Sequence, residues 1–408
     1  MKFRSYSLLA LGVALSLTPT PGAAQHYVQK NLVSDTVQPP NSDGSPVIVD
    51  PLLRNPWGAT RSASSPWWIS NNATGTSTLY DGNGSPIQIF VEADGTKNDF
   101  VTVPTSPLIP AGSTSNPTGI VFNGSSTDFL LNKGTPAGKP AVFIFVGEDG
   151  TITGWNPQVN LLPGGNPPSP NVVLEVDNSK GGAPNGAVYK GAAIALWNGR
   201  RFLYAANFRR GRIEVYDTNF NFVHLPDDAF QPKDDREGDH DDDHERIPLG
   251  FAPFNVQNIG GNLFVTYARQ DAERHDDVPG AGFGFVEIYS PAGRHIGHLE
   301  HGPWMNSPWG VVRTPRDFGR FSNSILVGNF GSGWIAAFNG FTYKFEGFLK
   351  NSDDSLVTIE GLWSLTFGNG GTAGPSTTLF FTAGTNGEND GLFGSLTPVA
   401  AENDESVE

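Results

Sequence analysis

A four-residue phrase returns six times along the chain at roughly even intervals, and this repetition is the feature that most restricts the fold. Such spacing indicates one supersecondary unit that is copied around or along an axis. The six copies are Asn55-Pro56-Trp57-Gly58, Asn116-Pro117-Thr118-Gly119, Tyr189-Lys190-Gly191-Ala192, Ala252-Pro253-Phe254-Asn255, Ser307-Pro308-Trp309-Gly310 and Glu360-Gly361-Leu362-Trp363.

A second phrase follows the first in several units and predicts a β-hairpin. Two short runs of β-branched and aromatic residues flank a turn glycine that lies four residues after Asn71, Asn207 or Asn329. The opening phrase adds an inner strand, and a further apolar run often follows. Four short strands per repeat, six repeats and no convincing helix predict an all-β fold, a six-bladed β-propeller. A parallel β-helix is the rival fold, but its repeats are nearer ~20 residues.

The last repeat contains one strand too few, while a spare strand, His26 to Val33, precedes the first repeat. We therefore expect the N-terminal strand to complete the last blade, which also removes an exposed sheet edge. The predicted organisation is a signal peptide at residues 1–24, a single propeller at 25–398 with an acidic loop at 227–246, and an acidic disordered tail at 399–408.

The charge and composition of the chain limit the classes of partner that it can bind and the compartment in which it acts. The formal net charge of −15 argues against nucleic acid as a partner, because binding to phosphates needs a basic face. The basic residues Lys2 and Arg4, followed by an apolar stretch too short to span a bilayer, are typical of a secretory signal. We therefore expect a monomer without a membrane span, secreted to the periplasm or the exterior. There is no cysteine, so the secreted fold depends on a packed core rather than on disulfides.

Several of these phrases also carry a family resemblance. The chain resembles a family of secreted, mostly bacterial proteins of unknown function, akin to NHL-type and YWTD-type propellers. The resemblance implies a propeller and export, and it implies no activity. The phrases that carry it are Asn55-Pro56-Trp57-Gly58, Asn116-Pro117-Thr118-Gly119, Glu148-Asp149-Gly150-Thr151-Ile152, Ala252-Pro253-Phe254-Asn255, Pro308-Trp309-Gly310, Leu326-Val327-Gly328-Asn329-Phe330-Gly331 and Phe380-Phe381-Thr382-Ala383-Gly384.

A metal site can be built from equivalent positions of several blades. Asn71, Asn207 and Asn329 end the second strand of three units, and Glu148 falls at about the same place in another. One carboxylate and several amide oxygens around an axis could hold Ca²⁺, as in six-bladed lactonases, where a metal polarises the ester carbonyl. The alternative is that each Asn satisfies turn amides at the end of its strand.

Large aromatic residues recur on the predicted innermost strands. These residues could line the central channel and stack on a sugar or another flat ligand, or they could fill the space between blades. They are Trp57, Phe254, Trp309 and Trp363.

The remaining charged clusters give weaker indications of a metal or catalytic site. The Asp/His-rich block at 227–246 could bind divalent cations loosely, but its charge favours a solvated loop. His295, His298 and His301 are expected to alternate faces of a strand and turn, as surface residues. There is no Gly-x-Ser-x-Gly motif. The sequence favours a non-enzymatic scaffold that binds a protein or a glycan, and the alternative is a Ca²⁺-dependent hydrolase or lactonase with its metal at the mouth of the channel.

Overall fold

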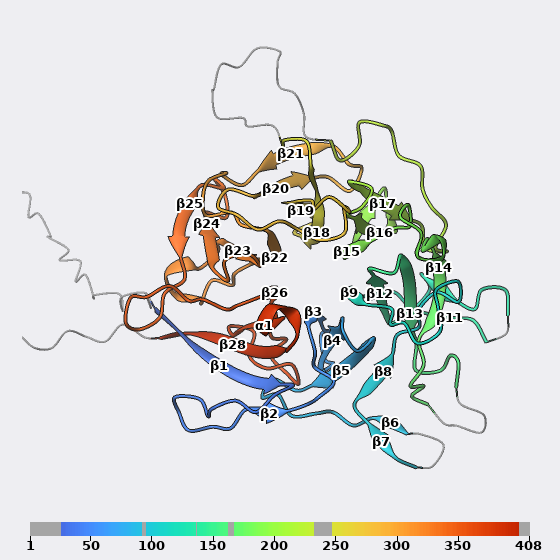
Figure 1. The fold of residues 1–408 in the computed structure, drawn as a ribbon, viewed down its shortest axis with the longest axis horizontal. Coiled ribbons are helices and arrows are strands. Elements are labelled where there is room, and N and C mark those ends of the chain that lie inside the picture. The colour runs from blue at the N-terminus through green and yellow to red at the C-terminus, as the bar shows by residue number, and fades with distance from the viewer. Residues whose placement is uncertain (1–25, 92–94, 136, 162–166, 232–246, 400–408) are drawn as a thin grey trace, which may run out of the picture.

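Six antiparallel sheets surround a central axis in a computed structural model of the chain, which describes residues 26–91, 95–135, 137–161, 167–231 and 247–399 (Figure 1). This arrangement confirms the predicted six-bladed β-propeller. The predicted signal peptide, most of the acidic loop and nearly all of the tail lie outside the described residues. Within the described ranges, no helix combines the length and the apolar character that crossing a membrane requires.

The innermost strand of each blade begins within one copy of the repeated phrase, or one residue before it in β18, and these strands surround the axis in Figure 1. The innermost strands are β3 (Pro56–Thr60), β9 (Pro117–Phe122), β15 (Tyr189–Trp197), β18 (Phe251–Ile259), β22 (Pro308–Arg313) and β26 (Leu362–Phe367). The second strands are β4 (Trp67–Asn71), β12 (Phe143–Gly147), β16 (Arg200–Asn207), β19 (Asn262–Arg269), β23 (Ile325–Asn329) and β27 (Leu379–Ala383).

The outer strands complete the blades with one exception. The third strands are β5 (Thr76–Tyr80), β13 (Thr151–Trp155), β17 (Arg212–Tyr216), β20 (Gly284–Tyr289), β24 (Ile335–Phe338) and β28 (Leu392–Val399). The fourth are β8 (Phe100–Thr102), β14 (Val173–Asp177), β21 (His295–His298), β25 (Phe345–Phe348) and, in blade six, β1 (His26–Ser34). Blade three departs from the prediction of four strands: among the described residues, only an isolated bridge between Tyr216 and Phe222 lies outside β17.

The remaining elements are short and lie outside this pattern. Strand β1 continues into a parallel contact with a fifth, outer strand of blade six. The additional elements are β2 (Ile48–Val49), β6 (Phe90–Val91), β7 (Lys97–Asn98), β10 (Leu130–Leu131), β11 (Lys139–Pro140), the helix α1 (Thr385–Glu388) and the 3-10 helices η1 (Lys180–Gly182) and η2 (Gly319–Phe321).

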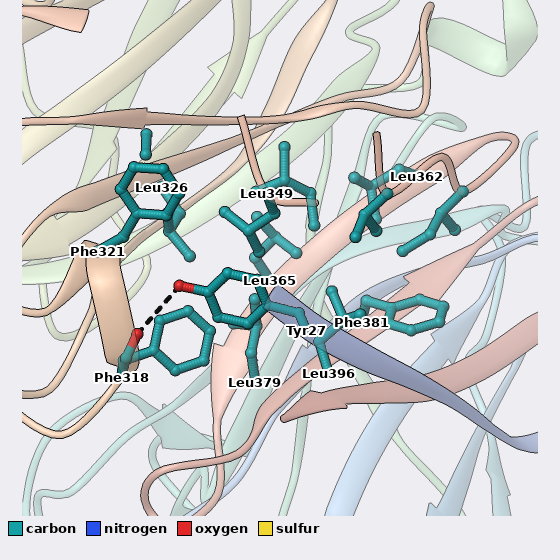
Figure 2. Close-up of a cluster of buried hydrophobic side chains, with 14 of the residues drawn as sticks. Tyr27, Phe318, Phe321, Leu326, Leu349, Leu362, Leu365, Leu379, Phe381 and Leu396 are labelled. Atoms are coloured by element: carbon teal, nitrogen blue, oxygen red, sulfur yellow. Dashed lines mark hydrogen bonds between the residues drawn. The ribbon is translucent and has the colours of Figure 1, made fainter. Parts of the chain in front are cut away.

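Strand β1 pairs antiparallel with β28 from His26 to Ser34, so the predicted closure of the ring by the N-terminal strand is confirmed. Tyr27 of this strand is 1% exposed, and its hydroxyl donates a 3.0 Å hydrogen bond to the carbonyl oxygen of Phe318 (Figure 2). Its ring packs 4.9 Å from the ring of Phe318, in the loop that joins the first two strands of blade five. The first strand of the propeller therefore joins blade six and also attaches it to blade five.

The hydrophobic core is divided among the interfaces between blades. One buried cluster lies at each of the six interfaces, because the two faces of every blade pack against its neighbours. Figure 2 shows the cluster between blades five and six, around Tyr27. A seventh cluster, formed by aromatic residues from several blades, lies on the axis.

Replacing Tyr27 with alanine should destabilise the protein by about 3 to 5 kcal/mol, the usual cost of removing a large buried aromatic side chain. The free energy of unfolding in denaturant measures the effect. The matched control is Val28→Ala on the same strand, whose side chain is 39% exposed. Equal losses in the two variants would show that β1 does not close the ring through Tyr27.

Candidate functional site

Loops from all six blades converge at one end of the channel. Each blade contributes the segment that leads into its innermost strand and the hairpin loop between its second and third strands. These segments share one end of the blade because neighbouring strands run antiparallel. The short helix α1 lies over this end in Figure 1. We call this end the loop mouth.

A β-bulge occurs at the same place in every blade. The register between the first two strands shifts at the repeated phrase in all six sheets. A bulge re-aims a side chain and bends its strand. The residues at the six bulges are Trp57, Thr118, Lys190, Phe254, Trp309 and Trp363.

The glycine after the bulge allows the innermost strands to approach closely. A Cβ atom on Gly58 would lie 2.5 Å from the carbonyl oxygen of Thr118 in the next blade, and one on Gly119 would lie 2.6 Å from the backbone nitrogen of Ala192. Both distances are shorter than any ordinary contact. Glycine at this position in blades one, two, three and five is therefore a packing requirement of the narrow axis, while Asn255 and Ser364 take its place in blades four and six.

The predicted aromatic residues meet on the axis, but they cover one another. Trp57 stacks on Trp363 with 3.5 Å between ring centroids, and Trp309 meets both of them edge to face. Trp57, Phe254, Trp309 and Trp363 are all 2% exposed or less. Together with Phe208 and Phe330, they form the axial aromatic cluster. Their faces are occupied by one another rather than turned to solvent.

Lys190 occupies the bulge position in blade three, where most other blades carry an aromatic residue. Its side chain is 1% exposed, and its ammonium lies 4.9 Å from the ring centroid of Trp57. The ammonium contacts the Glu148 carboxylate and lies 3.0 Å from Asp276 Oδ1. Burial acts to lower the pKa of Lys190, but the two carboxylates outweigh burial and raise it, so the lysine stays charged.

Neighbouring polar side chains hold these carboxylates in place. Asn72 Nδ2 donates a 2.7 Å hydrogen bond to Glu148 Oε2, and His275 Nδ1 lies 2.9 Å from Asp276 Oδ1. Burial opposes ionisation of Asp276, but His275 and Lys190 lower its pKa well below the usual range. The result is a network of blades one to four centred on one ammonium.

Two further carboxyl groups at the loop mouth have raised pKa values. Burial, with a smaller contribution from the charge of Glu148, raises the pKa of Glu388 on α1 to about 7, although Asn55 Nδ2 donates it a 2.8 Å hydrogen bond. Burial raises the pKa of Asp277 to about 6. Shifts of this kind cluster at functional sites, so the loop mouth is our candidate site.

The strand register separates Glu148 from the asparagines with which it was grouped. Gly147 pairs with Pro117 as Asn71 pairs with Pro56, so Gly147, and not Glu148, is the equivalent of Asn71. Glu148 instead corresponds to Asn72, and a shift of one residue turns a side chain to the other face of a strand. The expected equivalence of Glu148 and Asn71 is corrected on this point.

Each of the three asparagines forms hydrogen bonds within its own blade. Asn71 Nδ2 donates to the hydroxyls of Thr76 and Thr78. Asn207 Oδ1 accepts from the backbone of Val188 and Arg210, and Asn329 bonds to the backbone of Asn306 and Trp334. Within the described part of the chain, no hydrogen bond joins any two members of the predicted group Glu148, Asn71, Asn207 and Asn329. A calcium site on these four residues stays a prediction.

A different group of possible metal ligands lies at the loop mouth. One ligand atom from each of Glu148, His275 and Asp276 lies within 4.8 Å of the other two. The ammonium of Lys190 already contacts both carboxylates.

Lys190 was not singled out from the sequence, although the repeat contains the signal. The third copy of the phrase, as read from the sequence, places Lys190 one position earlier than Trp57, and only alignment on the following glycine matches Lys190-Gly191 with Trp57-Gly58 and Trp309-Gly310. The strand register confirms this alignment, because Tyr189 pairs with Asn207 as Pro56 pairs with Asn71. A charged residue at a position that is otherwise aromatic indicates a role other than hydrophobic packing. Its partners Glu148 and Asp276 come from other blades, and no spacing in the sequence connects them.

Behind the axial aromatic cluster, the channel continues as a cavity of about 340 Å³. All six innermost strands line it, mainly through glycine, alanine and β-branched residues. No charged side chain is among its lining residues, which are Gly58, Ala59, Thr60, Gly119, Ile120, Val121, Phe122, Ala192, Ala193, Ile194, Asn255, Gln257, Asn258, Ile259, Trp309, Gly310, Val311, Val312, Ser364, Leu365 and Thr366.

Viral proteins are similar to this chain over most of its length. An uncharacterized protein of Acanthamoeba polyphaga mimivirus is 31% identical over 358 residues, which cover 85% of this chain and 76% of the viral protein. The chain belongs to the family of this viral protein. A second uncharacterized protein of the same virus is 29% identical and covers 85% of this chain and 81% of its own length. These relatives are viral, whereas the sequence resemblance pointed to a mostly bacterial family. No protein-family model matches the chain.

Solved structures with a similar fold include three enzymes. Streptogramin B lyase has a TM-score of 0.44 at 10% identity and covers 91% of this chain and 97% of its own. Virginiamycin B lyase from Staphylococcus aureus has a TM-score of 0.41 at 10% identity, over 84% and 95% of the two chains. A glucose dehydrogenase has a TM-score of 0.42 at 12% identity, over 84% and 96%. At these values the likeness carries no argument about activity.

Replacing Lys190 with methionine should destabilise the protein by about 3 kcal/mol or more, because it leaves Glu148 partly buried without its counter-charge. The double variant Lys190→Met/Glu148→Gln should recover part of this loss, and a double-mutant cycle of unfolding free energies measures the coupling. Additive effects of the two substitutions would contradict a structural ion pair.

Replacing Glu388 with glutamine should make stability less dependent on pH. A carboxyl whose pKa rises from 4.5 to about 7 on folding binds more protons in the folded state between these values, so stability falls as pH rises through this window. The melting temperature of Glu388→Gln, relative to the unaltered protein, should therefore be higher at pH 8 than at pH 4. Glu360→Gln is the matched control, since this exposed carboxyl also contacts α1. A difference that is constant with pH would rule out the raised pKa.

Proposed function

We propose that the protein is a non-enzymatic binding propeller that holds a glycan, free or carried on a protein, at the loop mouth. The observation that carries this proposal is the network around Lys190, to which loops of different blades contribute amide, carboxylate and imidazole groups. Propeller-shaped proteins commonly place binding residues on loops that a rigid scaffold positions. A sugar hydroxyl both donates and accepts hydrogen bonds, and the loop mouth offers partners of both kinds.

The charge balance of the loop mouth supports a neutral ligand. The carboxylates of Glu148 and Asp276 face the ammonium of Lys190, and the Arg209 guanidinium is close enough to interact with both carboxylates. Burial raises the pKa of Glu388 to about 7, which lowers the negative charge that this carboxyl carries near neutral pH. A polyhydroxylated neutral ligand fits such a site better than a strongly charged one, because it needs no counter-charge.

We also propose that the protein is exported and acts as a monomer in the periplasm or outside the cell. This part of the proposal rests on the N-terminal sequence, whose residues 1–25 lie outside the described part of the chain. Mass spectrometry of the protein from its native compartment should find an N-terminus at Gln25.

A glycan array probed with the labelled full-length protein tests the main proposal. We expect binding to neutral oligosaccharides, and titration calorimetry with the best of them should show about tenfold weaker affinity for Asp276→Asn, as expected when one charged hydrogen-bond partner is lost. Asp276 is 65% exposed and Glu148 still pairs with Lys190 in its absence, so this variant should fold.

Arg316→Ala is the control, because Arg316 is exposed in the loop between β22 and β23, at the opposite end of the blade. Failure to bind any glycan, or an equal loss of affinity in the control, would exclude glycan binding at the loop mouth.

The alternative proposal is a Ca²⁺-dependent hydrolase or lactonase that uses Glu148. It is favoured by the two carboxylates of Glu148 and Asp276, which supply the oxygen ligands that Ca²⁺ prefers and have ligand atoms within 4.8 Å of each other and of His275. A cation there would compete with the ammonium of Lys190 for both carboxylates. Substrate hydrolysis would further require the metal to polarise a carbonyl.

Calcium should raise the melting temperature more in Lys190→Met than in the unaltered protein if this cluster can bind it, because the competing ammonium is gone. The further change Glu148→Gln should remove the gain. The result is the difference between variants in the rise of melting temperature that calcium causes, so calcium bound elsewhere does not affect it. A calcium response that ignores both substitutions would eliminate the hydrolase alternative at this site.

A further inference from the structure

A carboxylate and two imidazoles meet on the outer strands of blade four, at the rim of the propeller (Figure 1). Glu287 belongs to β20, and His295 and His298 begin and end β21. His295 Nε2 lies 2.6 Å from Glu287 Oε2. One ligand atom from each of the three side chains lies within 4.8 Å of the other two.

A β-bulge brings the two histidines to one face of the edge strand. Glu287 pairs with His298, Ile288 with Gly297 and Tyr289 with His295, so Ile296 is the extra residue. Without the bulge, residues three apart would point to opposite faces, which is the arrangement predicted from the sequence for these histidines. The structure corrects that expectation for His295 and His298. His301 lies apart, with its ring stacked on Phe285.

The carboxylate of the three is buried and the imidazoles are partly exposed, which suits a metal site that an ion can enter from solvent. The Glu287 side chain is 7% exposed and that of His295 is 15% exposed, while His298 is only partly buried. The edge of the His295 ring rests on Tyr289, at 5.5 Å between centroids, which holds the imidazole beside the carboxylate. A buried carboxylate with adjacent nitrogen donors at an accessible sheet edge provides both the ligands and a path for an ion.

We propose that Glu287, His295 and His298 form a binding site for a divalent transition metal of the zinc class. Two imidazole nitrogens and one carboxylate oxygen are donors that Zn²⁺, Co²⁺ and Ni²⁺ accept, whereas Ca²⁺ and Mg²⁺ prefer oxygen ligands. With bonds of about 2.0–2.2 Å, the ligand atoms of a tetrahedral site lie about 3.4 Å apart. The contact between Glu287 and His295 therefore opens by slightly less than 1 Å, and water takes the fourth position.

The site would connect two strands that are otherwise weakly joined. Strand β21 has four residues and pairs with β20 through three residue pairs at the edge of the blade. A metal held by both strands fastens this edge, and binding to the folded state alone raises stability. This site is independent of the loop mouth, because its residues lie on the outer strands of one blade.

Titration of the full-length protein, first treated with EDTA, tests the site. We expect ZnCl₂ to bind with an affinity measurable by calorimetry and to raise the melting temperature by a few degrees, while CaCl₂ does not replace it. CoCl₂ should produce the intense visible absorption of tetrahedral Co²⁺ at this site. His295→Ala and His298→Ala should each weaken this binding by more than about tenfold.

Three controls make the outcome decisive. His301→Ala, a histidine three residues away, should keep the Co²⁺ spectrum. Glu287→Gln preserves shape and hydrogen bonding, so it tests the ligand role if the histidine variants fail to fold. A His240→Ala/His244→Ala double variant tests the Asp/His-rich block. If this double variant abolishes the signal while His295→Ala and Glu287→Gln retain it, or if no Co²⁺ spectrum forms in the unaltered protein, the proposal is overturned.

Discussion

The close approach of six strands around one axis is the constraint on which the rest of this propeller depends. A Cβ atom on Gly58 would lie 2.5 Å from the Thr118 carbonyl oxygen, so the repeated glycine is needed for the strands to meet. The β-bulge next to it occurs in all six blades. Packing by Trp57, Trp309 and Trp363 then closes the axis from within. One repeated phrase therefore accounts for three features: the close spacing of the innermost strands, the β-bulge in each blade, and the aromatic side chains that fill the axis.

Lys190 is the charged residue among the bulge positions on the axis, and it organises the polar groups at one end of the channel. A lysine buried among aromatic rings is stable only with counter-charges, and Glu148 and Asp276 provide them from two other blades. These carboxylates are in turn held by Asn72 and His275. The loop mouth therefore contains a network of interdependent polar side chains that lies against the buried axial aromatic cluster. Such a network specifies geometry more than it adds stability, which suits recognition of a ligand by several blades at once.

Strand register explains where inference from the sequence was wrong. Glu148 was grouped with Asn71, but it lies one residue further along and faces Lys190. His295 and His298 were expected on opposite faces, but the bulge at Ile296 puts them on the same face. Both differences come from the two-residue period of a strand, because a single inserted residue reverses every following side chain. Bulges of this kind leave no mark in composition or spacing.

The sequence by itself determined the number of blades, the closure by the N-terminal strand and the position of Trp57, Phe254, Trp309 and Trp363 on the innermost strands. Each of these follows from local patterns, since a repeated phrase, a spare strand and an alternating apolar run are all short-range signals. Only the tertiary structure decided that Lys190 meets Glu148 and Asp276, and that Glu388 lies close enough to have its pKa raised. These residues belong to four different blades. Their meeting depends on how the ring closes, and hairpin patterns within a single blade contain no information about distances across the axis.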